Sequence, residues 1–250
     1  MFITDYANGG TFDNLGVQSL TLSNPYSDFV GFFADSSVDN SSVVCFASNT
    51  LIDTSTGARP VETLCVGDLV QTMDHGLQPI RWIGEWRHAA PGKHAPIVFS
   101  LDSLAPGVPD HELNVSPQHR ILISSPISEK MFGALEVIVA AKALLGLPGV
   151  FQRNGDEAVT YWHFACADHQ LVKANGAWAE TFYPGSVSLG VLNAAQQEEL
   201  LALMGPLENE PALARGTPPM RRQMKLAQRI AQHWPNRYPQ EQISVCYTRR

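Results

Sequence analysis

Residues 45–184 alternate short runs of β-branched and aromatic residues with turns built from Gly, Pro, Asn and Asp. Many short runs with frequent turn signals are typical of β sandwiches and barrels. The only helix expected within this stretch is a short one near Ala140–Leu145. The pattern therefore predicts a mostly β fold with short helices. The predicted strands are Thr50–Asp53, Asp68–Met73, Pro79–Arg87, Pro96–Leu101, Arg120–Ser124, Glu136–Ala140, Ala158–Cys166 and Gln170–Ala174.

The two flanks differ from this stretch in composition and charge. Residues 1–44 contain five Asp and no Lys or Arg, with turn signals between short strand-like runs, whereas residues 206–250 contain eight Lys or Arg and three Glu. Leu192–Met204 and Pro219–Trp234 have helical patterns, and we expect them to pack on the β domain or on a partner. The basic surplus is interpreted as a solvated helix face, with a docking surface as the alternative.

Bulk properties exclude several classes of protein. A formal net charge of −7 argues against general nucleic-acid binding. No apolar run approaches the roughly 20 residues of a membrane-spanning helix, and Met1–Tyr6 lacks the basic start and apolar middle of a secretory signal. We therefore expect no membrane span, and either a cytoplasmic location or export by a route without a signal peptide.

Cys45 is the candidate nucleophile among four scattered cysteines, which form no Cys-x-x-Cys pair. A thiol can attack the carbonyl of the preceding peptide bond, here Val44–Cys45, and turn the amide into a thioester by an N-to-S acyl shift. The reaction needs a base because a free thiol has a pKa of about 8.5. It also needs a proton donor for the departing amide nitrogen. Cys65 and Cys166 are predicted to lie in the core.

Three blocks of sequence resemble the Hint domain shared by Hedgehog autoprocessing domains, inteins and bacterial Hedgehog/intein-type proteins. The first block is Cys45–Ile52, continued by Gly57–Leu64 and Val66–Val70. The second is Val115–Leu122, in which Ser116 and His119 match a Thr-x-x-His motif with Ser in place of Thr. The third is Tyr161–Val172. The resemblance implies a Hint-type β fold with a helical C-terminal extension.

The resemblance also implies roles for individual residues. Cys45 would be the nucleophile, while His119 would polarise the Val44–Cys45 amide and protonate the leaving nitrogen. Ser116 would orient this histidine or the carbonyl, and His169 matches the histidine of the third block. Two further side chains are predicted to support the reaction. They are His163, which shares its strand parity with His169, and Asp168, because Trp162 occupies the position where inteins often carry a carboxylate.

The resemblance further predicts which reaction follows the thioester. Inteins carry a His-Asn pair shortly after the position of Asn175-Gly176, whereas this chain has Glu180-Thr181 there. We therefore expect no splicing, but cleavage or acyl transfer from the chain's own N-terminal segment to water or a small nucleophile. No cofactor and no metal are expected. A zinc site from His163, Cys166 and His169 is disfavoured because the cysteine has the opposite parity.

The predicted organisation has three parts: a short acidic segment 1–44 that resembles an N-extein, a Hint domain 45–185, and a basic helical extension 186–250. One alternative hypothesis is a non-catalytic Hint-fold interaction module of a secreted or surface-associated bacterial protein, with unidentified protein partners. A cysteine hydrolase acting on other proteins is a weaker alternative, since residues 1–44 would first have to leave the sulfur.

Overall fold

The computed structural model describes residues 44–89, 91–183, 197–198, 200, 202 and 215–233, all within a compact unit that spans Asp39–Arg250. The strands and turns predicted before Val44 lie outside these residues. So does most of the predicted helix Leu192–Met204, of which residues 197, 198, 200 and 202 are described and are helical.

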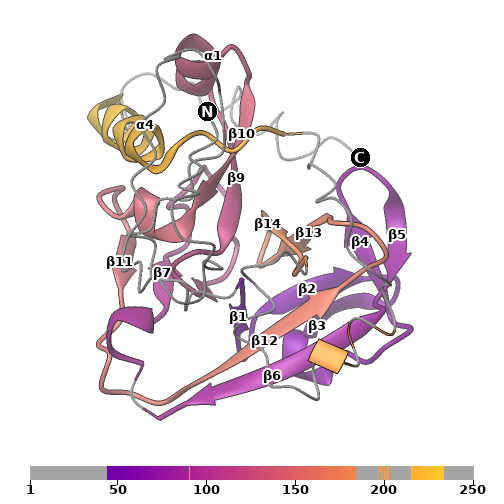
Figure 1. Cartoon of the computed structure of the whole chain (residues 1–250). Helices are drawn as coiled ribbons and strands as arrows, with labels where there is room; N and C mark the ends of the chain where they lie inside the picture. Colours follow the sequence, from indigo (N-terminus) through magenta and orange to yellow (C-terminus); the bar gives the residue numbers. More distant parts are fainter. Residues whose placement is uncertain are drawn as a thin grey trace, which may run out of the picture. The chain divides into compact units, whose positions relative to one another are not determined.

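The described residues build two antiparallel sheets, which confirms the mostly β fold (Figure 1). The six-stranded sheet has the order β11-β7-β8-β1-β12-β6, and the eight-stranded sheet has the order β10-β9-β14-β13-β2-β4-β5 with β3 paired to β2. The strands are β1 (Phe46–Ala47), β2 (Leu51–Thr54), β3 (Gly57–Pro60), β4 (Leu69–Thr72), β5 (Gly76–Pro79), β6 (Trp82–His88), β7 (Ile97–Phe99), β8 (Leu113–Val115), β9 (Arg120–Ser124), β10 (Glu136–Ala140), β11 (Val150–Gln152), β12 (Val159–Ala165), β13 (Leu171–Ala174) and β14 (Ala177–Glu180).

All eight predicted strands are present, two of them with identical bounds, Arg120–Ser124 and Glu136–Ala140. The predicted strand Pro79–Arg87 is divided, because β5 ends at Pro79 and β6 begins at Trp82. The Asn175-Gly176 turn joins β13 to β14, and both of its residues have positive φ, 45° and 79°. Asn-Gly adopts this conformation at low cost, and its twist matches that of a hairpin.

The helices whose bounds are described are α1 (Pro126–Phe132) and α4 (Met220–His233), accompanied by 3-10 turns at Val61–Thr63, Gly92–His94 and Ala141–Leu144. The last of these confirms the helix expected near Ala140–Leu145. The helix α1 was not predicted. Ser125 caps it by accepting a hydrogen bond from the Ile127 amide at 3.1 Å, and Gly133 ends it with a φ of 73°.

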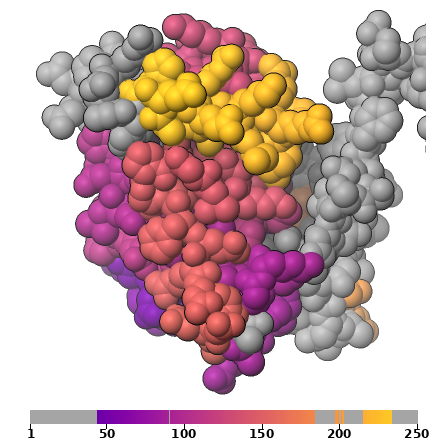
Figure 2. Space-filling view, turned by 90° about the vertical axis from the view of Figure 1, so that its left-hand side faces the viewer, coloured from indigo at the N-terminus to yellow at the C-terminus, as the bar shows by residue number. Residues whose placement is uncertain are grey.

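The helix α4 confirms the prediction for Pro219–Trp234 and packs on the β domain. Its residues Leu226, Ala227 and Ile230 are buried in the main core. The Gln223 side-chain oxygen also accepts a hydrogen bond from the Ala140 amide at 2.9 Å, which ties the helix to β10. Figure 2 shows α4 lying across the surface. The prediction that these helices pack on the β domain is therefore confirmed for α4.

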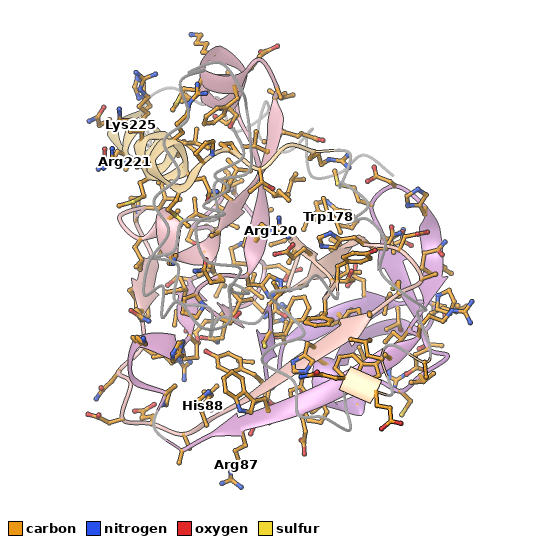
Figure 3. The ribbon with its side chains drawn as sticks, viewed as in Figure 1. Arg87, His88, Arg120, Trp178, Arg221 and Lys225 are labelled. Atoms are coloured by element: carbon orange, nitrogen blue, oxygen red, sulfur yellow. The ribbon has the colours of Figure 1, made fainter. Side chains whose placement is uncertain are left out.

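The basic residues of α4 lie on its outer face. Arg221, Arg222, Lys225 and Arg229 are exposed, and Figure 3 shows Arg221 and Lys225 on the side of the helix away from the sheets. This distribution is that of an amphipathic helix whose apolar face is buried in the core. It agrees with the solvated helix face predicted for this part of the chain.

The main core lies between the sheets, and a smaller cluster covers the other face of the six-stranded sheet. The smaller cluster consists of Cys45, Ala47, Trp82, Tyr161, Ala165, Phe182 and Leu200. Cys166 is buried in the main core, as predicted, but the prediction for Cys65 was wrong. Cys65 is exposed because it begins the turn that leads into β4, and its amide donates to the Asp68 carboxylate at 2.8 Å.

Candidate active site

Cys45 directly precedes β1, a two-residue strand that pairs with β8 on one side and β12 on the other. Side chains alternate along this segment. Phe46 therefore points into the main core, while Cys45 and Ala47 point into the smaller cluster. The Cys45 residue is 1% exposed, and Val44 before it is half-buried. The thiol is thus fixed in position by pairing on both sides of the strand that follows it.

The turn Ser116–His119 holds the backbone of Cys45 on both sides. The Cys45 amide donates to Ser116 Oγ at 3.0 Å, and the Ser116 amide donates to the Cys45 carbonyl at 2.9 Å. His119 Nδ1 lies 2.9 Å from the same carbonyl oxygen. The hydroxyl of Ser116 is therefore hydrogen-bonded to the nitrogen of the Val44–Cys45 bond, whereas the imidazole lies one peptide group further along the chain.

The contacts of His119 define its protonation state. The side chain is fully buried, and burial lowers its pKa to about 4. It is therefore neutral near pH 7, and Nδ1 carries the proton because a carbonyl oxygen can only accept. The ring also packs on Phe46, with 4.4 Å between the ring centroids. The position of His119 is consequently fixed by the strand that carries the thiol.

The imidazole of His163, on β12, contacts the sulfur of Cys45. Nδ1 lies 3.4 Å from Sγ, and both groups are buried. Burial raises the pKa of the Cys45 thiol well above its ordinary range and lowers the pKa of His163 to about 4. The pair is therefore a neutral thiol beside a neutral imidazole. This side chain was predicted only in a supporting role.

A buried charge cluster lies beside this site and was not predicted. Glu180 is fully buried, and its Oε2 lies 2.7 Å from an Arg120 guanidinium nitrogen and 3.0 Å from His169 Nε2. Its other carboxylate oxygen accepts hydrogen bonds from Arg120 N at 2.9 Å and Nε at 2.8 Å. Burial alone would raise the pKa of Glu180, but the charge of Arg120 and the contacts with His169 lower it to about 2. Figure 3 labels Arg120 in this region.

The remaining site residues predicted from the sequence do not meet the thiol. The side chain of His169 is directed to Glu180 and stacks on Tyr183, with ring centroids 5.5 Å apart. The expectation that His163 and His169 share one face required a regular strand, and that condition is not met, because β12 ends at Ala165 and a turn follows before β13. Asp168 lies in this turn and is exposed.

A zinc site also finds no support in the described part of the chain. Cys166 points into the main core, away from the cluster that contains Cys45. Among the described residues no group of three His, Cys, Asp or Glu side chains is arranged to hold a metal ion.

A groove opens on the same face of the six-stranded sheet as Cys45. Its lining begins at Ala47, two residues after the thiol. It is lined by residues that follow the nucleophile and by side chains of the strand ends around it, including Ala47–Thr50, Glu112, Asn114, Arg153 and Thr160. In the register of β1 and β8, Asn114 lies beside Ala47 and Ser116 lies beside Cys45. The lining is mostly polar, unlike the apolar surroundings of the sulfur.

Several of these features could be anticipated only in part. A glutamate within the small and apolar run Ala177–Glu180 signals a buried charge if that run is a central strand, and such a charge requires a partner. Arg120 directly follows His119 in the second motif, and this position indicates that Arg120 could be the charged partner of such a glutamate. No local signal identifies Trp82 or Phe182 as neighbours of the site, because their positions depend on pairing between distant strands.

No helix in the described ranges combines the length and the apolar character required to cross a lipid bilayer.

Comparison with known proteins gives a family match and several similar solved structures, among them the following three. The family model described as the Hint domain matches residues 44–186. A bacterial intein-like domain from Clostridium thermocellum is 14% identical, covers 56% of this chain and 98% of its own, and has a TM-score of 0.38. The gp41-1 intein is 12% identical with 56% and 98% coverage and a TM-score of 0.33. A splice-inactive AceL NrdHF class 3 split intein is 12% identical, with 58% and 99% coverage and a TM-score of 0.38. A search of curated proteins found no match.

Proposed function

The chain belongs to the Hint-domain family, a family of self-processing domains, and from this premise we propose that it cuts its own Val44–Cys45 peptide bond through a thioester. The observation that carries the proposal is the set of hydrogen bonds between the Ser116–His119 turn and Cys45. They hold the backbone nitrogen and the carbonyl oxygen of Cys45, and the thiol belongs to the same buried residue. Such fixation supplies the effective concentration of an intramolecular reaction, about 10⁵ M or more.

The proposed reaction has two balanced steps. In the first, the Cys45 thiol loses its proton, sulfur bonds to the Val44 carbonyl carbon, and the C–N bond breaks. The nitrogen of Cys45 keeps the bonding electrons and gains one proton, so no net proton is consumed. In the second step, water or a small nucleophile attacks the thioester. Residues 1–44 then leave as an acid or as an adduct, and the thiol of residues 45–250 is restored.

Ser116 and His119 have different roles in this proposal. The Ser116 hydroxyl accepts a hydrogen bond from the departing nitrogen at 3.0 Å, and we assign it the relay of a proton to that atom as the C–N bond breaks. His119 holds the carbonyl of Cys45 at 2.9 Å and thereby fixes the peptide group that follows the thiol-bearing carbon. Ser116 acts on the bond that breaks in the transition state, where a positioned group is worth most, whereas His119 acts by holding Cys45 in place.

Splicing is not part of the proposal. Cyclisation at the C-terminal junction of an intein needs an Asn side-chain amide, and the corresponding stretch here is Glu180-Thr181. A carboxylate has no nucleophilic nitrogen, and that of Glu180 is held by Arg120 and His169. The Thr181 hydroxyl accepts a hydrogen bond from the Gln170 amide at 3.0 Å. These contacts support a structural rather than a splicing role for this stretch.

Intact-mass spectrometry of the purified full chain tests the proposal. With dithiothreitol or hydroxylamine over a day, we expect two species that correspond to residues 1–44 and 45–250. Cys45→Ala should remain full length, and Cys65→Ala is the matched control because Cys65 is exposed and its amide is bonded to Asp68. A single full-length species for the unaltered chain under all conditions would show the proposal to be wrong.

One observation favours a second candidate function, that of a non-catalytic interaction module. The Cys45 thiol is enclosed by apolar side chains, including Trp82 and Leu200, and burial keeps it protonated. An inert buried cysteine would have the same surroundings. The mass-spectrometry experiment separates the two candidates, because release of residues 1–44 that depends on Cys45 excludes the non-catalytic module.

A further inference from the structure

The thiol of Cys45 and the imidazole of His163 are brought together by strand register. Phe46 pairs with Trp162 in an antiparallel register, so Cys45, which precedes Phe46, lies beside His163, which follows Trp162. This pairing places His163 Nδ1 3.4 Å from Cys45 Sγ, across 118 positions of sequence. Among the described histidines, His163 is the one whose ring contacts this sulfur.

The ring of His163 lies in a slot built by neighbouring aromatic residues. It stacks on Trp82 with centroids 5.1 Å apart and planes 20° apart, and it packs on Phe182 at 5.5 Å and 37°. These contacts hold the ring in one orientation and enclose it in an apolar environment. A ring held in this way keeps its distance and orientation toward the sulfur, which is the geometry that proton transfer needs.

Gly84 on β6 makes room for this arrangement. It pairs with His163, and a β-carbon at position 84 would lie 3.0 Å from the His163 Nε2 and 2.7 Å from the Trp82 ring. Both rings are buried and have no free space into which to move. The absence of a side chain at this position therefore allows the imidazole to lie flat against the strand.

We infer that His163 is the base that takes the thiol proton of Cys45, and that Gly84 is a positioning residue that keeps the imidazole in line with the sulfur. The inference rests on the proposed cleavage at Val44–Cys45. The S–H bond breaks, the proton moves to His163 Nδ1, and the electron pair left on sulfur forms the bond to the Val44 carbonyl carbon. The imidazolium later releases its proton, which balances the proton gained by the Cys45 nitrogen.

The other two histidines near the site are engaged elsewhere. His119 has its Nδ1 on the Cys45 carbonyl, and His169 is directed to Glu180. Because His163 is neutral, its Nδ1 has a lone pair available in the tautomer that carries the proton on Nε2. A neutral imidazole next to a thiol is the arrangement that activates cysteine nucleophiles in general.

The first test is the rate of cleavage as a function of pH, followed by intact mass. His163→Ala should slow cleavage about 100-fold or more at pH 7, which is the usual size of a general-base contribution. The residual rate should rise about tenfold per pH unit, because hydroxide then has to remove the thiol proton. Gly84→Ala should also slow cleavage. Gly216→Ala is the control, since nothing lies within 4 Å of a β-carbon at that position.

Urea unfolding of every variant separates loss of the base from loss of the fold. If His163→Ala is folded and cleaves at the original rate with an unchanged pH profile, the inference is wrong. His163→Gln, which keeps a polar side chain but not the basicity, should be as slow as His163→Ala. A rate close to that of the unaltered chain in the glutamine variant would also overturn the inference.

A second readout is independent of cleavage, so that failure of the proposed function and failure of this inference can be distinguished. In a chain with Cys65→Ser, Cys166→Ala and Cys246→Ser, the infrared S–H stretch reports Cys45 alone. A thiol that donates to nitrogen absorbs at a lower frequency than a free thiol, and His163→Phe should abolish this shift. If the shift is absent from the folded parent, the thiol–imidazole pair does not form and the inference is overturned.

Discussion

Replacement of Arg120 by Met should destabilise the domain because it leaves the buried Glu180 carboxylate without its charged partner, with His169 and the backbone amide of residue 120 as the remaining contacts. The pKa of Glu180 is about 2 in the fold and 4.5 in the reference state. At about 1.4 kcal/mol per pH unit, this difference corresponds to about 3 kcal/mol of stabilisation by its partners. Arg120 makes the largest favourable contribution, so most of that amount should be lost.

The effect has a defined pH dependence. A depressed carboxylate pKa stabilises the fold fully above pH 4.5, and this stabilisation disappears as the pH falls through about 2. The difference between Arg120→Met and its parent should therefore be greatest near pH 7 and decrease below pH 4.5. Urea unfolding at pH 7 and pH 3 measures it, with both chains in a Cys45→Ala background so that each remains a single species.

Arg153→Met is the matched control. The ion pair of Arg153 with Glu112 has a similar distance, 2.7 Å, but the two side chains are 44% and 45% exposed. Exposed pairs contribute about 0–1 kcal/mol, so this control should change stability little at either pH. If Arg120→Met costs no more than Arg153→Met at pH 7, the argument that the buried cluster stabilises the site is refuted.

Three further predictions concern the site. Ser116→Ala should slow cleavage about 100-fold or more by removing the group that relays a proton to the departing nitrogen, whereas Ser116→Thr should keep most of the rate. Equal rates for both variants in the mass assay would contradict this role. Acidification from pH 7.5 to pH 5 should lower the free energy of unfolding by about 2 kcal/mol for each of His119 and His163. The reason is that these two side chains take up a proton in this range only in the unfolded chain. Equal urea midpoints at the two pH values would contradict the prediction. Iodoacetamide should label Cys65 in the folded chain but label Cys45 and Cys166 only after denaturation, as peptide mapping can show, and rapid labelling of Cys45 would indicate an open site.

Local signals determined how much of the fold could be predicted. Strands such as Arg120–Ser124 were found because their apolar runs end at turn residues, and the Asn175-Gly176 hairpin follows from the backbone preference of its two residues. The strand β1 was not predicted, since two residues carry no periodic pattern. The helix α1 was missed although Ser125 and Pro126 form a usual start signal, because the preceding strand pattern dominated the interpretation.

The candidate site was predicted less completely than the fold. Cys45, Ser116 and His119 were assigned from short motifs, and the structure brings these three together. The contact of His163 with the sulfur depends on the register of β1 against β12, which no short sequence window specifies. The parity argument did not apply to His169 because it required a regular strand where the chain makes a turn. Long-range pairing is thus the information that the motifs lack.

The short strand β1 pairs with β8 on one side and β12 on the other, so the residue that follows Cys45 is anchored by later parts of the chain. A break ahead of Cys45 would remove no ladder hydrogen bond of β1. The strand pairing that positions the thiol would therefore be the same before and after the cut.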